Sequence, residues 1–166
     1  MLLASAGFAI SLILMALEIS YGKTKDLAAR EVLIQKITAL RDLQTKLAGA
    51  ADRDLEVFNS YRALLKKKDP DEEELKVALK EATGSPLEVC GLIRTSISLS
   101  NACETYCNKR VLSDLKAGSL LLEAIYKGLL LLAEGNVELL APEEREFYQQ
   151  WKEKEENKRS EVLNDV

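Results

Sequence analysis

Apolar side chains recur every three or four residues along most of this chain, which is the spacing of one face of an α-helix. The same spacing and the turn residues predict helices over residues 3–20, 24–67, 70–107 and 114–132, and a last one that begins near residue 141. We therefore expect an all-α fold, an antiparallel bundle of about five helices. The clearest apolar stripe, in the second helix, consists of Leu33, Ile37, Leu40, Leu43 and Leu47.

Turn residues and prolines mark where we expect these helices to begin and end. Gly22 would end the first helix, and Asp69 in the run KKKDPDEEE would cap the third. The stretch GSP, which ends at Pro86, should interrupt or kink the third helix, because proline has no amide hydrogen and crowds the preceding turn. From about residue 152 the chain is charged throughout, and we expect a solvated helix end there.

Two of the predicted helices are apolar on nearly all sides. MLLASAGFAISLILMAL carries no charge before Glu18, and LSDLKAGSLLLEAIYKGLLLL is the most hydrophobic segment. The first run falls short of the about twenty apolar residues of a membrane span and lacks the basic start of a signal peptide. We expect a bundle helix and no membrane partner; anchoring through residues 2–17 is the alternative. Two such helices exceed what the centre of one short chain needs, so we expect a homodimer.

Length and charge narrow the possible classes of protein. The 166 residues suit one domain, which we place over residues 1–166. The net charge is −4, and because acids and bases are interspersed, no nucleic-acid surface is expected. Histidine is absent, which excludes a Ser-His-Asp mechanism and a His-bearing zinc site. Proton transfer would have to come from Asp, Glu, Lys, Tyr or Cys.

The cysteines do not form the pattern of a secreted disulfide framework. Cys103 and Cys107 are four residues apart, and we interpret them as small buried hydrophobic residues of one helical face. We expect no metal site and a reducing, cytoplasmic environment.

The pair Ser113-Asp114 directly precedes the most apolar helix. An aspartate in this position can cap the helix, or it can be a catalytic carboxylate, and spacing alone leaves both interpretations open. Lys23 and the run 66–68 are candidate contacts for an anionic ligand, although lysines in loops are commonly just solvated.

Four segments, taken in order, resemble parts of one protein family. ASAGFAISLILMALEISYGK is similar to the family's Ala-Gly-Ala helix, which ends in Gly-Lys. DLEVFNSYRALLKKKDPDEEE is similar to its D-x-x-x-F-N-x-Y segment. LKEATGSPLEVC shares a Pro-Leu step, and CNKRVLSDLKAGSLLLEAIYKG resembles an Asn-rich boundary with a Ser-Asp pair. This family is that of the folate-handling cyclodeaminases and cyclohydrolases, which includes the cyclodeaminase half of formiminotransferase-cyclodeaminase. The resemblance to it covers roughly residues 4–140.

The resemblance implies an all-helical homodimer that acts on a tetrahydrofolate carrying a one-carbon unit. A cyclodeaminase closes the formimino group onto a second nitrogen and releases ammonia, whereas a cyclohydrolase adds water to the methenyl bridge. Both need proton transfer around a tetrahedral carbon, for which Asp114 would be the catalytic residue. Ser113, Lys23, Asn108 and Asn136 would bind the substrate, and neither a metal nor a redox cofactor is implied.

The chain departs from the family pattern in three places. The family's Pro-Gly-Gly-Gly-Ser loop would end where this sequence begins, and the family's Leu-Pro-Lys turn is replaced by KKD. In the late Asn-Val-x-x-Asn-Leu run, Leu132 takes the first asparagine position and Asn136 matches the second. These departures keep a second interpretation open, in which the chain is a catalytically inactive relative that serves as a helical structural subunit. The sequence does not separate cyclodeaminase from cyclohydrolase.

Overall fold

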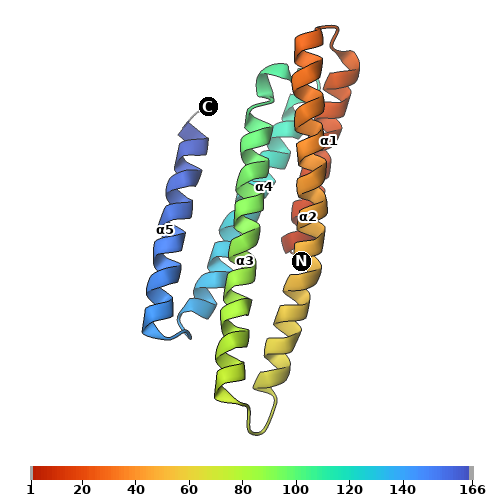
Figure 1. Ribbon diagram of the computed structural model, residues 1–166. Coiled ribbons are helices and arrows are strands. Elements are labelled where there is room, and N and C mark those ends of the chain that lie inside the picture. The colour runs from red at the N-terminus through yellow and green to blue at the C-terminus, as the bar shows by residue number, and fades with distance from the viewer. Residues whose placement is uncertain (1, 165–166) are drawn as a thin grey trace. The chain divides into compact units, whose positions relative to one another are not determined.

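The computed structural model describes residues 2–164, and side chains for residues 2–155 and 157. It contains five α-helices and one short 3-10 helix, η1 (Figure 1). The described residues include no strand, so the predicted all-α class is confirmed. In chain order the elements are α1 (Leu2–Lys23), α2 (Leu27–Leu65), α3 (Glu72–Asn101), η1 (Glu104–Tyr106), α4 (Leu112–Val137) and α5 (Pro142–Asn164).

The chain forms two compact units. Unit 1 consists of residues 1–48 and 92–126, and unit 2 consists of residues 49–91 and 127–166. The long helices α2, α3 and α4 each contribute to both units, whereas α1 belongs to unit 1 and α5 to unit 2. Each unit is thus built from four α-helical segments, and unit 1 also contains η1. The expectation of one domain over residues 1–166 stays a prediction.

The α1 and α4 helices approach each other closely within unit 1. A Cβ atom on Gly118 of α4 would lie 2.5 Å from Ile13 Cγ1 and 3.0 Å from the Ala9 carbonyl oxygen of α1. Only glycine allows this separation without displacing α1. The largest fully buried side chains of unit 1 complete its core: Ile10, Ile13, Leu17, Leu33, Leu40, Leu47, Ile93, Leu115, Leu122 and Tyr126.

The α3 helix runs without interruption through Pro86, where the sequence predicted a break or kink. Proline at this position cannot donate to the carbonyl oxygen of Ala82, four residues earlier. Asn136 of α4 donates from Nδ2 to that oxygen at 3.2 Å. A side chain from another helix thus replaces the missing backbone donor, and the sequence-based prediction of an interruption was wrong.

Several helix ends also differ from the prediction. Asp71, not Asp69, caps α3: its Oδ1 accepts from the amides of Glu73 at 2.9 Å and Glu74 at 3.0 Å. The α3 helix ends at Asn101, so the segment 102–107 is not the helical face expected for its two cysteines, although both are buried. The α4 helix extends beyond residue 132 to Val137.

The α1 helix is longer than the apolar run suggested. It has 22 residues, and its most apolar 18-residue window has a mean hydropathy of 2.2, so by length and composition it could cross a membrane. The prediction that the run is too short for a span was therefore wrong. Within the structure 44% of that window is buried. Core helices of bundles pass the same test, so this finding alone is weak evidence for a membrane segment.

Candidate functional site

A polar cluster lies at the end of unit 1 where α1 ends and the α3–α4 connection passes. The buried hydroxyl of Ser20 donates to the Ala16 carbonyl at 2.7 Å and accepts from the Asn108 amide at 2.8 Å. Cys107 Sγ lies 3.6 Å from the same hydroxyl. Asn108 Oδ1 in turn accepts from the Arg110 amide at 3.0 Å. Ser20 therefore fixes the connection, with Asn108 in it, to the last turns of α1.

Asp114 stands in the first turn of α4, beside this cluster. Burial raises the pKa of the Cys107 thiol above its ordinary value; the Ser20 hydroxyl opposes this rise, and the charges of Glu104 and Asp114 add to it. The carboxylate of Asp114 is therefore close enough to act electrostatically on the cluster. Its own side chain is half-buried.

The capping interpretation of Ser113-Asp114 finds no support. These are the second and third residues of α4, and within the described part of the chain neither side chain hydrogen-bonds a backbone amide. A negative charge in the first turn still favours the helix through its dipole. The oxygens of Asp114 are not committed to the backbone, which leaves them available to a ligand.

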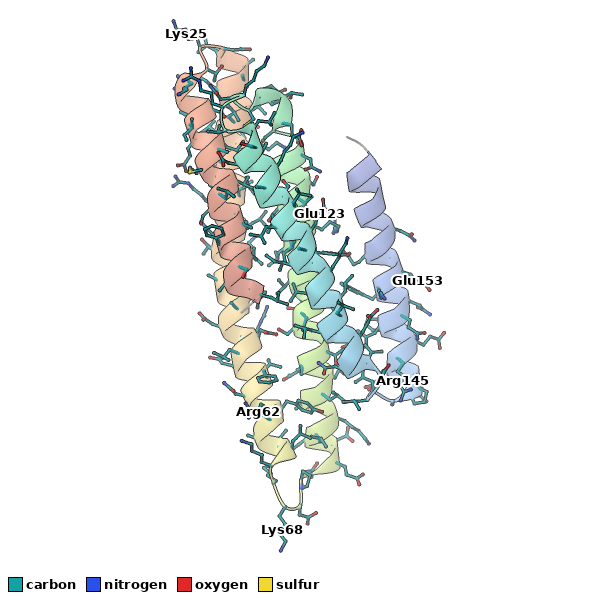
Figure 2. All side chains as sticks on the ribbon, turned by 180° about the vertical axis from the view of Figure 1, so that it is seen from behind. Lys25, Arg62, Lys68, Glu123, Arg145 and Glu153 are labelled. Carbon is teal, nitrogen blue, oxygen red and sulfur yellow. The ribbon has the colours of Figure 1, made fainter. Side chains whose placement is uncertain are left out.

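Four of the five residues predicted for the site lie at this end of unit 1. Lys23 is the exposed last residue of α1, and Ser113 is exposed next to Asp114. Figure 1 shows the α1–α2 loop and the α3–α4 connection at the same end, which Lys25 marks in Figure 2. The fifth predicted residue, Asn136, belongs to unit 2.

A cavity of about 210 Å³ in unit 2 gathers residues from two of the family-like segments and from the late run of α4 that contains Leu132 and Asn136. The D-x-x-x-F-N-x-Y segment of α2 supplies its aspartate, phenylalanine and tyrosine, which share one helix face at steps of four and three. The α3 segment around Pro86 and the C-terminal part of α4 supply the other lining residues. The lining residues are Asp54, Val57, Phe58, Tyr61, Ala82, Pro86, Leu132 and Asn136.

Asp54 is the carboxylate of this cavity, and sequence reasoning did not select it. It is half-buried, and its Oδ1 accepts from Ser85 Oγ at 2.9 Å. Asn136 Nδ2 donates one of its two hydrogens to the Ala82 carbonyl, which leaves its second N–H as a donor and its Oδ1 as an acceptor. Phe58 and Leu132 add apolar walls. A carboxylate beside apolar and aromatic surface can exchange a proton with a flat, largely apolar molecule.

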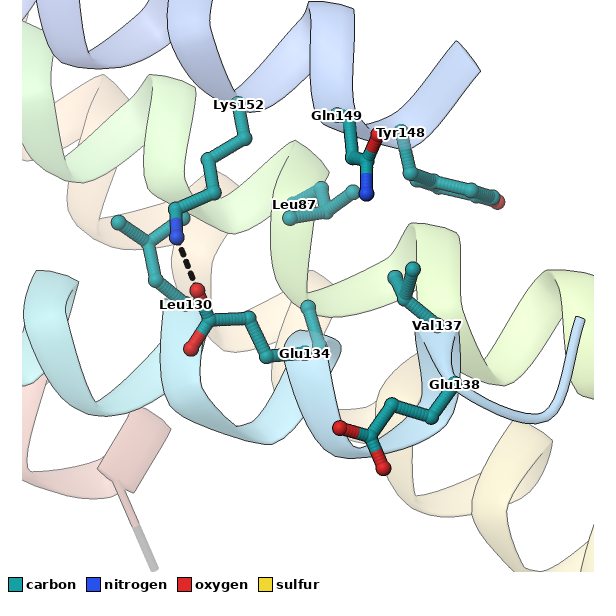
Figure 3. A pocket seen from close by; sticks show the side chains of 9 residues that line it. Leu87, Leu130, Glu134, Val137, Glu138, Tyr148, Gln149 and Lys152 are labelled. Atoms are coloured by element: carbon teal, nitrogen blue, oxygen red, sulfur yellow. Dashed lines mark hydrogen bonds and ion pairs between the residues drawn. The ribbon is translucent and has the colours of Figure 1, made fainter. Parts of the chain in front are cut away.

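Unit 2 contains two further hollows in which acids and bases pair with each other. A cavity of about 320 Å³ between α3, α4 and α5 is lined by apolar residues and crossed by an ion pair of Lys152 and Glu134 (Figure 3). A groove of about 650 Å³ along α2 and α3 holds the Arg53–Glu88 ion pair at 3.0 Å. The described residues include no group of three or more acids or cysteines placed to hold a metal ion.

The fold is all-helical, and each of the two candidate sites holds a half-buried carboxylate, Asp114 in unit 1 and Asp54 in unit 2. The family model of formiminotransferase-cyclodeaminase matches residues 3–157. The chain therefore belongs to this family.

Comparison with solved structures agrees with the family assignment. The crystal structure of formiminotetrahydrofolate cyclodeaminase from Thermotoga maritima is similar to this chain with a TM-score of 0.87. The two sequences are 20% identical, and the match covers 98% of this chain and 81% of the other. At this identity the likeness shows a common fold. No curated protein sequence gives a significant match.

Proposed function

We propose that the chain is an enzyme of folate one-carbon metabolism that acts on the formimino or methenyl group of a tetrahydrofolate derivative. The observation that carries the proposal is the cavity of unit 2. There, residues from two family-like segments and from the late run of α4 surround the carboxylate of Asp54. Membership of the family and the common fold support the same substrate class. We further propose that the protein works as a homodimer in the cytoplasm.

Either reaction needs a carboxylate that accepts a proton and gives it back. In cyclodeamination a second folate nitrogen attacks the formimino carbon, and a proton passes from that nitrogen to the departing ammonia. In ring opening the carboxylate takes a proton from the water that adds to the methenyl carbon, and a carbon–nitrogen bond then breaks to leave a formyl group. The carbon keeps its oxidation state in both reactions, so neither requires a redox cofactor.

Two carboxylates compete for this role. The family resemblance assigns it to Asp114, with Ser113 and Asn108 beside it and Lys23 to hold an anionic part of the folate. The geometry of unit 2 offers Asp54, held by Ser85. We propose Asp114 as the acid–base residue. Asp54 is the competing assignment, and under it Asn136, which lines the same cavity, would be a substrate contact. A pair of single substitutions separates them.

The test is turnover of both folate substrates by Asp114→Asn and Asp54→Asn. The substitution of the true acid–base residue should lower kcat by about a hundredfold or more, with an unchanged melting temperature. Asp52→Asn, an exposed aspartate of α2, is the matched control and should keep full activity. Loss of activity in Asp54→Asn alone would move the role to the cavity of unit 2. Absence of turnover in the wild-type chain, folded and with both substrates, would contradict the proposal.

A second candidate function is that of a catalytically inactive structural subunit. One observation favours it: Leu132 lines the cavity where the family pattern has an asparagine, so this position of the wall has no hydrogen-bonding side chain. Under this alternative Leu132→Asn would bind folate no better than the wild-type chain. Under our proposal the added amide should raise folate affinity or kcat measurably.

A further inference from the structure

Residues Gly84-Ser85-Pro86, which we call the GSP step, lie in the middle of α3 and beside the cavity of unit 2. Glycine and proline are the two weakest helix formers, so helix propensity does not explain this sequence inside a helix of 30 residues. Two hydrogen bonds offer an explanation. One joins the GSP step to α2, and the other is one that the proline permits between α3 and α4.

The hydroxyl group of Ser85 bonds outside its own helix. A serine or threonine inside a helix commonly donates to the carbonyl oxygen four residues earlier, and in α3 Thr83 and Ser96 do so at 2.7 and 2.9 Å. Ser85 donates instead to Asp54 Oδ1 of α2 at 2.9 Å. A hydroxyl has a single hydrogen, so Ser85 gives it to the carboxylate of the cavity and not to the backbone of α3.

Pro86 acts on the same cavity through the backbone. Because proline has no amide hydrogen, the Ala82 carbonyl four residues earlier loses its usual helical donor. Asn136 Nδ2 of α4 takes that place at 3.2 Å. A side-chain amide is planar, so a fixed Nδ2 also fixes the directions of Oδ1 and of the second N–H. All three residues line the cavity, and the amide is therefore oriented at its wall.

We infer that the GSP step is a positioning element for the cavity of unit 2. Ser85 orients the carboxylate of Asp54. Pro86 orients the amide of Asn136, because it leaves the Ala82 carbonyl to that amide. Each oriented group keeps a free oxygen that can accept from a ligand, and the amide also keeps one N–H. Groups that are held before the ligand arrives lose less side-chain entropy on binding, so they bind it more tightly.

The oriented groups and the aromatic lining indicate the kind of ligand. Phe58 and Tyr61 come from the same face of α2 as Asp54 and offer flat apolar surface. A flat ring whose edge carries N–H and carbonyl groups can donate to Asp54 and pair with Asn136. The ring system of a folate is such a ligand, and this choice rests on the proposed function, with the cavity of unit 2 as the binding site. The positioning itself is a property of the chain without a ligand.

NMR of the ligand-free chain, with isotope-labelled asparagine, tests the positioning. The side-chain signal of Asn136 is identified by its absence in Asn136→Ala. Its bonded hydrogen should exchange with solvent about tenfold more slowly than those of Asn59, an exposed asparagine of α2. In Pro86→Ala the new backbone amide competes for the Ala82 carbonyl, so the Asn136 signal and its exchange rate should move toward those of Asn59.

Calorimetric titration with 5-formyltetrahydrofolate tests the consequence for binding. Pro86→Ala and Ser85→Ala should each lower the affinity about fivefold, whereas Ser85→Thr keeps the hydroxyl and should bind like the wild-type chain. Alanine is a far better helix former than proline, so the melting temperature of Pro86→Ala should not fall. A purely structural role of the GSP step does not give weaker binding without lower stability. Ser98→Ala, at an exposed serine of α3 outside the cavity, is the matched control and should change neither value.

Two results would overturn the inference. An Asn136 signal that is the same in Pro86→Ala as in the wild-type chain would show that the proline does not orient the amide. Folate affinity that is unchanged in both Ser85→Ala and Pro86→Ala would show that the oriented groups do not bind this ligand. Absence of folate binding by the wild-type chain, together with the expected change of the Asn136 signal, would contradict the proposed function and support the positioning.

Discussion

Replacement of Gly118 by alanine tests the contact that holds α1 against α4. The new Cβ atom would lie 2.5 Å from Ile13 Cγ1 and 3.0 Å from a backbone oxygen of α1. The first distance is about 1 Å shorter than an ordinary carbon contact, and overpacking of this kind costs about 1–3 kcal/mol. Alanine also gains about 1 kcal/mol over glycine inside a helix. The net loss should therefore reach about 2 kcal/mol.

Gly49→Ala is the matched control, because this glycine lies inside α2 and a Cβ atom there meets nothing within 4 Å. Its free energy of unfolding should rise by up to about 1 kcal/mol. Both variants gain the same helix propensity, so it cancels when their free energies of unfolding are subtracted. The difference that remains is the overpacking cost of about 1–3 kcal/mol. Urea unfolding at a fixed protein concentration measures both values.

A double-mutant cycle identifies the atoms responsible. Ile13→Ala removes the side-chain atoms that the new methyl group would meet, so part of the cost of Gly118→Ala should disappear in the double variant. Two results would refute the assigned contact. One is equal changes in the free energy of unfolding for Gly118→Ala and Gly49→Ala; the other is a double variant whose loss of stability equals the sum of the losses of Ile13→Ala and Gly118→Ala.

Three further substitutions test other contacts. Ser20→Ala removes the acceptor of the Asn108 amide and should cost about 1–3 kcal/mol in urea unfolding, whereas exposed Ser11→Ala should cost less. Asp71→Ala removes the cap of α3 and should lower stability by about 0.5–2 kcal/mol; equal stability would contradict the assigned cap. Burial raises the pKa of the Cys90 thiol from 9.0 to about 12. The protonated thiol therefore favours the folded state below pH 9, and this contribution to stability is lost as the pH rises from 9 to 12. The free energy of unfolding of Cys90→Ala should depend less steeply on pH over that range.

Local pattern was sufficient to predict the helices but not all of their ends. The three- and four-residue spacing of apolar residues located all five α-helices, because each must bury one side. The same spacing wrongly predicted that the third helix continues to residue 107, whereas α3 ends at Asn101. Cys103 and Cys107 are both buried four residues apart, as helix neighbours would be, yet they flank the 3-10 helix. Burial at helical spacing therefore did not prove a helix.

Contacts between distant segments explain what sequence reasoning missed. Pro86 should end a helix by local rules, but Asn136 supplies the missing donor from fifty residues away. The close approach at Gly118 likewise depends on where α1 lies. The spacing of Asp54, Phe58 and Tyr61 was visible in the sequence, but only the tertiary structure shows that α3 and α4 close a cavity over them.

The measurement that tests the central claim most directly is calorimetric titration of the full chain with 5-formyltetrahydrofolate, a stable reduced folate. Our account predicts saturable binding that weakens in Asp114→Asn and is unchanged in Asp52→Asn; weakening in Asp54→Asn alone would move the site to the cavity of unit 2. Absence of binding at millimolar folate, by a chain whose circular dichroism shows the expected helices, would contradict it.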